Sequence, residues 1–154
     1  MTNLNVAIFG CSGAIGKALC IEYTKKQNID NIIAYSRSGE NFENNLIKSI
    51  KVDYCNEESL SNAASSLQFK LDIIIVAIGA LENPEKSIKD LSAQKFLDMF
   101  NANTIPTALI AKYFLPCLYR DKTTKFASIS ARVGSIEDNE PVSYTHLRAP
   151  RQRD

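Results

Sequence analysis

Short runs of apolar residues alternate along the chain with segments in which apolar residues recur every three or four positions. The first pattern predicts buried strands and the second predicts amphipathic helices. Five strands are expected, at Leu4–Phe9, Asn31–Tyr35, Ile47–Val52, Asp72–Ile78 and Lys125–Ser130. Strands that alternate with helices are typical of a parallel sheet covered on both faces. The pattern therefore predicts an α/β fold with a doubly wound parallel sheet, in which Ile73–Val76 forms the central strand.

Two segments carry the clearest helical pattern. Glu57–Leu67 has apolar residues at positions i, i+3, i+4 and i+7, and two glutamates in its first turn suit the helix dipole. A longer helix is expected over Ser92–Tyr119, with Asn103 on its apolar face. Pro106 lies inside this helix and cannot donate to the carbonyl of Ala102, so a bend is expected nearby. A buried amide beside a free carbonyl favours a water or proton-relay site, and a kinked helix with a satisfied core amide is the alternative.

Size and composition exclude several classes of function. The chain has 154 residues and a net charge of +1, which indicates one domain and argues against nucleic-acid binding by bulk electrostatics. No apolar stretch is long enough to span a bilayer, and no basic-then-apolar signal segment opens the chain. The four cysteines are scattered without metal-ligand spacing, so a reduced, cytoplasmic setting is expected.

The first predicted strand is followed at once by a glycine-containing turn and then by an amphipathic segment. The turn reads Gly10-Cys11-Ser12-Gly13-Ala14-Ile15-Gly16. A strand that passes through glycines into a helix presents backbone N–H groups, and the positive end of the helix, to a phosphate. The arrangement predicts a dinucleotide site, and a purely structural strand-to-helix turn is the alternative.

With these features in place, the chain resembles the short-chain dehydrogenase/reductase family over about Asn3 to Asp138, and Phe126–Asn139 resembles its C-factor-like branch. The turn is similar to the family's TGxxxGxG motif, in which Gly10 and Gly16 match the first and last glycines and Ala14 stands at the middle one. The resemblance implies a Rossmann-type fold that binds a nicotinamide nucleotide. The residues implied to bind it are Gly10, Ser12, Gly13, Ala14, Ile15, Gly16, Ser36, Arg37, Asp53, Ala77, Gly79 and Asn103.

The end of the second strand suggests which nucleotide is preferred. Family members that prefer NAD carry an acidic residue there, whereas this chain has Ser36 followed by Arg37. A guanidinium can pair with a 2′-phosphate, so NADP(H) is expected in preference to NAD(H). Asp53 resembles the aspartate that closes the family's adenine pocket. Gly79 is retained where the family usually has NNAG, but both asparagines are absent.

The catalytic residues are only partly represented. Asn103 matches the family's catalytic-helix asparagine, which agrees with the polar site expected at the bend. The family's active-site serine falls on Ala131, so Ser130 is the remaining candidate, although neighbours on a strand point to opposite faces. The family's Tyr-x-x-x-Lys motif, which supplies the acid–base chemistry, has only a superficial counterpart at Tyr144 and Arg148.

The last residues differ in character from the rest. Pro150 would break the helix on which such a motif must lie, and the tail lacks apolar periodicity. Val142–Ala149 also resembles the translation of a transposase-based sequencing adapter. We therefore expect the native sequence to end near Glu140, with residues 1–140 forming an NAD(P)-binding Rossmann domain and residues 141–154 a non-native tail. The sheet would then be incomplete at its C-terminal side, with the last strand at an exposed edge.

These observations predict an NADP(H)-dependent carbonyl/alcohol oxidoreductase, of which this chain is a cofactor-binding fragment inactive alone. A small-molecule carbonyl or alcohol would be the substrate, and the intact protein is expected to be a homo-oligomer without nucleic-acid or membrane partners. The alternative is a non-catalytic NADP(H)-binding or signalling module, which the absent asparagines and Ala131 favour.

Overall fold

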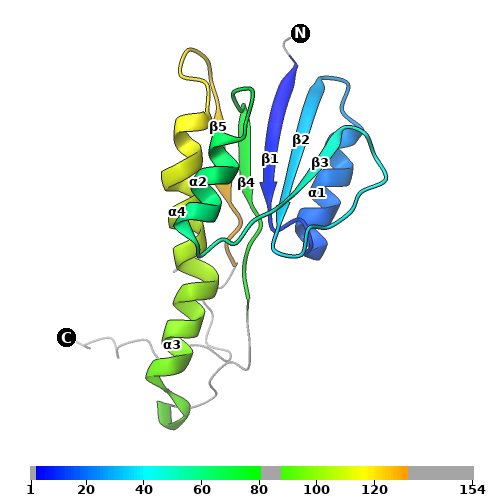
Figure 1. The fold of residues 1–154 in the computed structure, drawn as a ribbon. Coiled ribbons are helices and arrows are strands. Elements are labelled where there is room, and N and C mark those ends of the chain that lie inside the picture. Colours follow the sequence, from blue (N-terminus) through cyan, green and yellow to red (C-terminus); the bar gives the residue numbers. More distant parts are fainter. Residues whose placement is uncertain (1–2, 81–87, 132–154) are drawn as a thin grey trace, which may run out of the picture.

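The computed structural model describes residues 3–80 and 88–131. The predicted tail at residues 141–154, with Tyr144 and Arg148, lies outside the described residues. Within these ranges, five parallel strands form one sheet in the order β3-β2-β1-β4-β5. The strands are β1 (Leu4–Phe9), β2 (Ile29–Ser36), β3 (Ile47–Lys51), β4 (Ile73–Val76) and β5 (Lys125–Ser128) (Figure 1). The α/β, Rossmann-type doubly wound sheet predicted from the sequence is confirmed.

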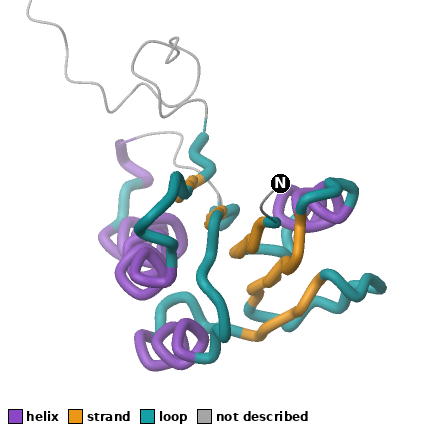
Figure 2. The backbone as a smooth tube through the Cα atoms, turned by 90° about the horizontal axis from the view of Figure 1, so that it is seen from above, coloured by secondary structure: helices purple, strands orange, loops and turns teal. Residues whose placement is uncertain are grey.

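Helices cover both faces of this sheet, as the view from above shows (Figure 2). The helices are α1 (Ala14–Thr24), α2 (Glu57–Ser65), α3 (Ala93–Met99) and α4 (Ile105–Phe114), with a π-helical turn at Phe100–Thr104 and short 3-10 turns at Ile88–Asp90 and Leu115–Cys117. Residues of α1 pack against one face, and residues of α2 and α4 pack against the other. No helix in the described part of the chain is long and apolar enough to cross a membrane.

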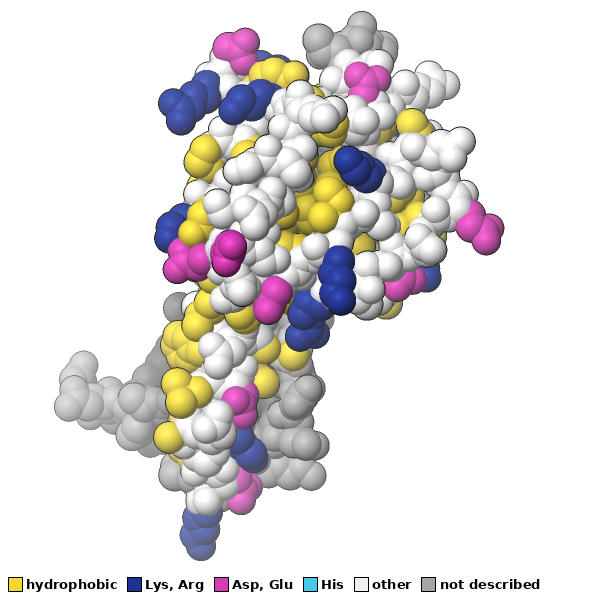
Figure 3. All heavy atoms as spheres, in the orientation of Figure 1, with side chains coloured by type: hydrophobic (Ala, Val, Ile, Leu, Met, Phe, Trp, Pro, Cys, Tyr) yellow, Lys and Arg dark blue, Asp and Glu magenta, His cyan; other side chains and the backbone are white. Residues whose placement is uncertain are grey.

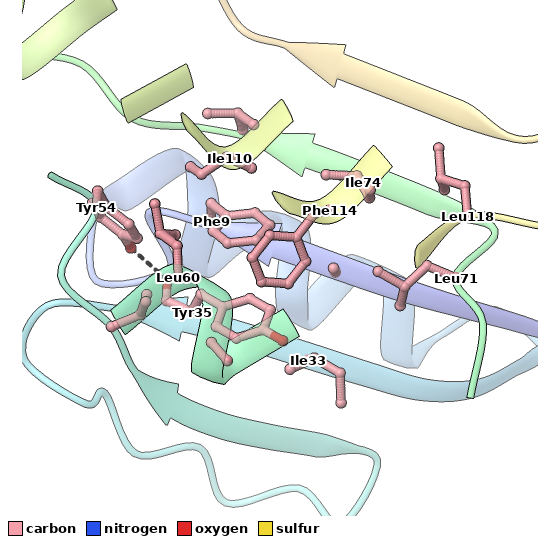
Figure 4. Close-up of a cluster of buried hydrophobic side chains, with 14 residues drawn as sticks. Phe9, Ile33, Tyr35, Tyr54, Leu60, Leu71, Ile74, Ile110, Phe114 and Leu118 are labelled. Carbon is pink, nitrogen blue, oxygen red and sulfur yellow. Dashed lines mark hydrogen bonds between the residues drawn. The ribbon is translucent and has the colours of Figure 1, made fainter. Parts of the chain in front are cut away.

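The core has two layers because side chains alternate along β1. Val6 and Ile8 lie in the layer under α1, whereas Ala7 and Phe9 lie in the layer under α2 and α4. The second layer is built around aromatic rings (Figure 4). The Phe9 ring stacks on Tyr35 with centroids 4.5 Å apart and meets Phe114 edge-on at 4.8 Å.

All five predicted strands are present among the described residues, with differences at the ends. β2 begins two residues earlier than predicted, and β4 covers only Ile73–Val76 of the predicted Asp72–Ile78. β4 is largely buried, as expected, but β1 rather than β4 is the middle strand of the described sheet. A continuous apolar run indicates that a strand is buried on both faces. Every interior strand of such a sheet is buried in this way, so the run cannot identify which strand is the middle one.

The long helix predicted over Ser92–Tyr119 is divided. Ser92 caps α3 as expected, since its Oγ accepts the N–H of Lys95. The helix then widens into the π-helical turn, in which the Ile105 N–H bonds to the Phe100 carbonyl five residues back. Pro106 follows directly, so the expected bend takes the form of a π turn.

The predicted inward face of this helix is not buried. α3 extends beyond the carboxyl ends of the strands (Figure 1) and has no buried residue. Phe96, Leu97 and Phe100 are 49%, 57% and 56% exposed, and apolar side chains along this helix are visible in Figure 3. The expectation that Asn103 continues a buried stripe is therefore wrong, because Asn103 is itself exposed and α3, directly before its turn, has no buried residue.

Candidate functional site

The register of the parallel strands brings the predicted site residues to one edge of the sheet. Phe9 of β1 lies opposite Tyr35 of β2 and Val76 of β4, so the chain leaves all three strands at the same level. From β1, the sheet runs to β2 and β3 on one side and to β4 and β5 on the other. The edge between β1 and β4 is the switch point at which ligands of open α/β sheets bind.

Gly10 and Gly16 make the turn after β1 possible. Gly10 has a φ of +87°, and a Cβ added there would lie 2.4 Å from the carbonyl oxygen of Ala77, which follows β4. A Cβ on Gly16 would lie 2.2 Å from the Gly10 carbonyl oxygen. The backbone therefore packs at distances that exclude any side chain at these two positions. Gly13 differs, because its added Cβ would meet nothing closer than 3.4 Å.

The first turn of α1 is open to an anion. The first intrahelical bond runs from the Lys17 N–H to the Gly13 carbonyl at 2.9 Å, so the N–H groups of Ala14, Ile15 and Gly16 have no partner within the helix. Gly13 is the N-cap and supplies no side-chain cap, and the first turn has no acidic residue. Ala14 is exposed, so the Cβ at the family's middle-glycine position points away from the packed turn.

The Tyr54 hydroxyl stabilises this turn through two hydrogen bonds, a role that no sequence pattern indicated. Its hydroxyl donates to the Tyr35 carbonyl at 2.7 Å (Figure 4) and accepts the Gly10 N–H at 3.0 Å. One buried phenol thus joins the ends of β1 and β2 to the segment after β3. Burial raises the pKa of Tyr54, and the hydrogen bond from the Gly10 N–H and, less strongly, the positive charge of Arg37 oppose that shift. Its position directly after Asp53 was the only available signal.

The segment after β2 begins with Ser36, which was predicted to bind the cofactor. Its side chain is fully buried, and its Oγ accepts the N–H groups of Gly39 at 2.9 Å and Glu40 at 3.0 Å. Its role in this structure is to shape the loop. Arg37 is exposed and makes no ion pair with any side chain in the described ranges, so its guanidinium remains available to a ligand.

Asp53 lies two residues after the end of β3 and forms a tight local turn. Its Oδ1 accepts the N–H of Cys55 at 3.0 Å, and its own N–H donates to the Ser59 Oγ at 3.0 Å. The Cys55 thiol in turn donates to the carbonyl of Asn101 at 3.4 Å. Because Asn101 lies five residues before Pro106, which has no N–H, its carbonyl lacks the donor that the π register would otherwise supply.

Asn103 clamps the segment after β4. Its Oδ1 accepts the Ala80 N–H at 2.7 Å and its Nδ2 donates to the Ala80 carbonyl at 3.0 Å. Both polar atoms of the amide are therefore engaged, although the residue is exposed. Gly79 lies beside it, with 3.6 Å between an added Cβ and the Asn103 Oδ1. The structure brings Asn103 to the site as a positioning residue for this segment.

Ser130 stands apart from these contacts. It lies two residues beyond β5 and is exposed, as is Ala131. The chain is still attached to β4 just before it, since the Ile129 N–H donates to the Val76 carbonyl at 2.9 Å. Ser130 thus occupies the correct edge of the sheet, but it has no hydrogen bond to another described site residue.

Sequence comparison identifies the family. Residues 4–145 match the short chain dehydrogenase family. The chain belongs to this family of oxidoreductases. A search of curated proteins finds no match.

Solved structures of short-chain dehydrogenases share the fold. The Sniffer protein of Caenorhabditis elegans aligns with a TM-score of 0.80 at 21% identity over 90% of this chain and 68% of its own. An NADPH-bound carbonyl reductase from chicken aligns with 0.77 at 19% identity over 90% and 61%. A short-chain dehydrogenase/reductase from Burkholderia multivorans with bound NADP aligns with 0.77 at 20% identity over 90% and 63%. In the latter two, this chain spans less than two thirds of the relative's length.

Compared with the family's usual motifs, this chain has the glycine-containing turn after β1 but lacks some of the side chains of the segment after β4. The glycines at positions 10, 16 and 79 are present, and the asparagines of the NNAG segment are not. The Asn103 clamp on Ala80 supplies side-chain bonds to the segment after β4 from another element.

Proposed function

We propose that this chain binds a nicotinamide dinucleotide at the carboxyl edge of the sheet, with NADP(H) preferred over NAD(H). The observation that carries the proposal is the open first turn of α1 at the same edge of the sheet as Arg37, whose guanidinium makes no ion pair with the described residues. Three unpartnered N–H groups and the helix dipole suit a pyrophosphate. The close packing at Gly10 and Gly16 leaves the turn without side chains that would block its approach.

The residues present fit such a group without rearrangement of the turn. The N–H groups of Ala14, Ile15 and Gly16 would hold the pyrophosphate, and Arg37 would pair with a 2′-phosphate. Asp53 retains its second carboxylate oxygen for the adenine side, and the backbone of Ala77 and the following residues would line the nicotinamide side. When bound, the nucleotide supplies a hydride to, or accepts one from, a small-molecule carbonyl or alcohol.

A titration of the ¹⁵N-labelled chain tests the site directly, because NMR detects binding even in the millimolar range. Saturable shifts of the Ala14, Ile15 and Gly16 amides on addition of NADPH are expected, with weaker binding of NADH. Arg37→Gln should weaken NADPH binding about tenfold, since a charge-assisted hydrogen bond is lost, and should leave NADH unchanged. Arg120→Gln, in the loop before β5 at the opposite edge of the sheet, is the matched control.

The outcomes separate the parts of the proposal. If neither nucleotide moves these amides, the site is not a dinucleotide site. If both bind but Arg37→Gln affects them equally, the preference for NADP(H) is wrong and the dinucleotide site stands.

Catalysis is the part of the proposal that needs residues other than those described. We expect no NADPH-dependent carbonyl reduction by the 154-residue chain, because the family's acid–base tyrosine and lysine have no counterpart in residues 3–80 and 88–131. Measurable turnover would contradict this. A non-catalytic NADP(H)-binding module is the second candidate, favoured by Ala131 and by the exposed Ser130. Sequencing the gene beyond Asn139 discriminates: a Tyr-x-x-x-Lys motif supports the enzyme, and its absence supports the module.

A further inference from the structure

The loop after β2 returns a carboxylate to the edge of the proposed nucleotide site. The Ser36 Oγ accepts the N–H groups of both Gly39 and Glu40, which turns the chain back immediately after the strand. Gly39 has a φ of +74°, a conformation that favours glycine. The backbone of this loop is therefore held by a buried hydroxyl, and the position of Glu40 follows from it.

Glu40 then bridges to α1. Its Oε1 lies 2.8 Å from the Nζ of Lys17, in the first turn of that helix. The contact with Glu40 raises the pKa of Lys17, first through the hydrogen bond and then through the charge. The same carboxylate charge also contributes to the raised pKa of Cys11, behind the larger effect of burial. The negative charge of Glu40 thus reaches the glycine-containing turn as well as Lys17.

The Lys17–Glu40 pair links the first turn of α1 to the loop after β2, the loop in which Arg37 also lies. Arg37 and Lys17 are positive, and Glu40 neutralises Lys17. A 2′-phosphate placed beside Arg37 would meet a carboxylate in the same loop and a lysine that is already paired. A 2′-hydroxyl carries no charge, so the charges of both side chains affect its binding much less.

We infer that Glu40, through its ion pair with Lys17, is a specificity-determining residue that limits the preference for a 2′-phosphorylated nucleotide over an unphosphorylated one. The inference rests on the proposed nucleotide site and concerns the selectivity of that site. The sequence position of Glu40, four residues past the strand, conceals this role, because only the turn held by Ser36 brings it to α1. Removing its charge frees Lys17 as a second cation for the phosphate.

The alternative is that the ion pair only holds the loop in place. Exposed pairs contribute about 0–1 kcal/mol to folding, so both readings predict a small effect on stability. They differ in selectivity. A loop-holding role would change the affinities for the two nucleotides by the same factor, whereas a charge effect changes only that for the phosphorylated one.

The test compares Glu40→Gln with Glu43→Gln, which removes the same charge from an exposed position in the same loop. The probes are adenosine 2′,5′-bisphosphate and adenosine 5′-monophosphate, titrated into the ¹⁵N-labelled chain. Glu40→Gln should tighten binding of the bisphosphate about three- to fivefold and leave the monophosphate unchanged. The gain should shrink in high salt, because the effect is electrostatic. Glu43→Gln should leave both affinities unchanged.

A complementary variant strengthens the test. Lys17→Gln leaves Glu40 unpaired, so binding of the bisphosphate should weaken by at least the same factor while the monophosphate is unaffected. Equal changes for the two probes, or no change with Glu40→Gln, would overturn the inference while leaving the nucleotide site intact. If the unmodified chain binds neither probe, the site itself is wrong and the inference falls with it.

Discussion

Replacement of Gly16 by alanine tests the packing on which the turn depends. The added Cβ would lie 2.2 Å from the Gly10 carbonyl oxygen, 2.7 Å from its carbon and 2.9 Å from the Cys11 Cα. All three atoms belong to the backbone, so no side chain can rotate away. Ordinary contact begins at 3.4 Å, and α1 must therefore move by about 1 Å relative to the end of β1.

The expected loss follows from two opposing effects. Overpacking in a close-packed region costs about 1–3 kcal/mol, and the backbone clash places this variant at the upper end. Alanine is favoured over glycine inside a helix by about 1 kcal/mol. We therefore expect Gly16→Ala to lower the free energy of unfolding by about 2 kcal/mol, and to weaken NADPH binding because the first-turn N–H groups are displaced.

Gly13→Ala is the matched control, since the same methyl group is added three residues away. Its Cβ would meet the Gly10 carbonyl oxygen at 3.4 Å, and its φ of −80° suits alanine. A loss of less than about 1 kcal/mol is expected, from the weaker N-cap preference of alanine. Urea unfolding followed by far-UV circular dichroism measures both variants. Equal stabilities for the two, within about 0.5 kcal/mol, would show that the turn is not closely packed and would refute the reasoning.

Three further outcomes are expected. Tyr54→Phe should lower the free energy of unfolding by about 1 kcal/mol in urea unfolding, because the carbonyl of Tyr35 loses one of its three donors, the other two being the N–H groups of Gly10 and Cys11; an unchanged midpoint would contradict the role of the phenol. Asn103→Ala should cost about 1 kcal/mol by the same assay, and Asn103→Asp should recover only part of it, since a carboxylate cannot donate to the Ala80 carbonyl. Burial raises the pKa of the Cys20 thiol from 9.0 to about 12, so the stability that it contributes is complete below pH 9 and declines as the pH rises toward 12. Urea unfolding between pH 8 and pH 11 in reductant should show this decline, to which Cys20 contributes up to about 1.4 kcal/mol per pH unit, and Cys20→Ala should reduce the slope by that share and leave the share of Cys11 and Tyr54, whose pKa values burial also raises; an unchanged slope in that variant would exclude the Cys20 thiol as a cause.

The local elements were predictable because they depend on residues close together in the chain. The strand Leu4–Phe9 matches the prediction at both ends, and Glu57–Leu67 differs only in its last two residues. Asn56, directly before this helix, caps it by accepting the Ser59 N–H. Apolar spacing and the carboxylates of a first turn are local signals, and tertiary packing did not override them.

The site was predictable as a location and not as a set of contacts. Parallel strands end at one edge, so the turn at Gly10, the end of β2 and the segment after β4 had to meet there. The partner of each polar atom was not predictable. Ser36 was expected to face a ligand, but its hydroxyl is occupied by two N–H groups of the following loop.

The sequence by itself determined the alternation of strands and helices, the glycine-containing entry to α1 and the edge of the sheet at which a ligand would bind. The tertiary structure alone decided that Tyr54 supports the turn from 44 residues away, that Asn103 clamps Ala80 across 23 residues, and that Glu40 pairs with Lys17 across another 23. The physical reason is that apolar periodicity indicates which face of an element is buried. The hydrogen-bond partner of a polar side chain, in contrast, is set only when the fold brings a donor or acceptor within hydrogen-bonding distance.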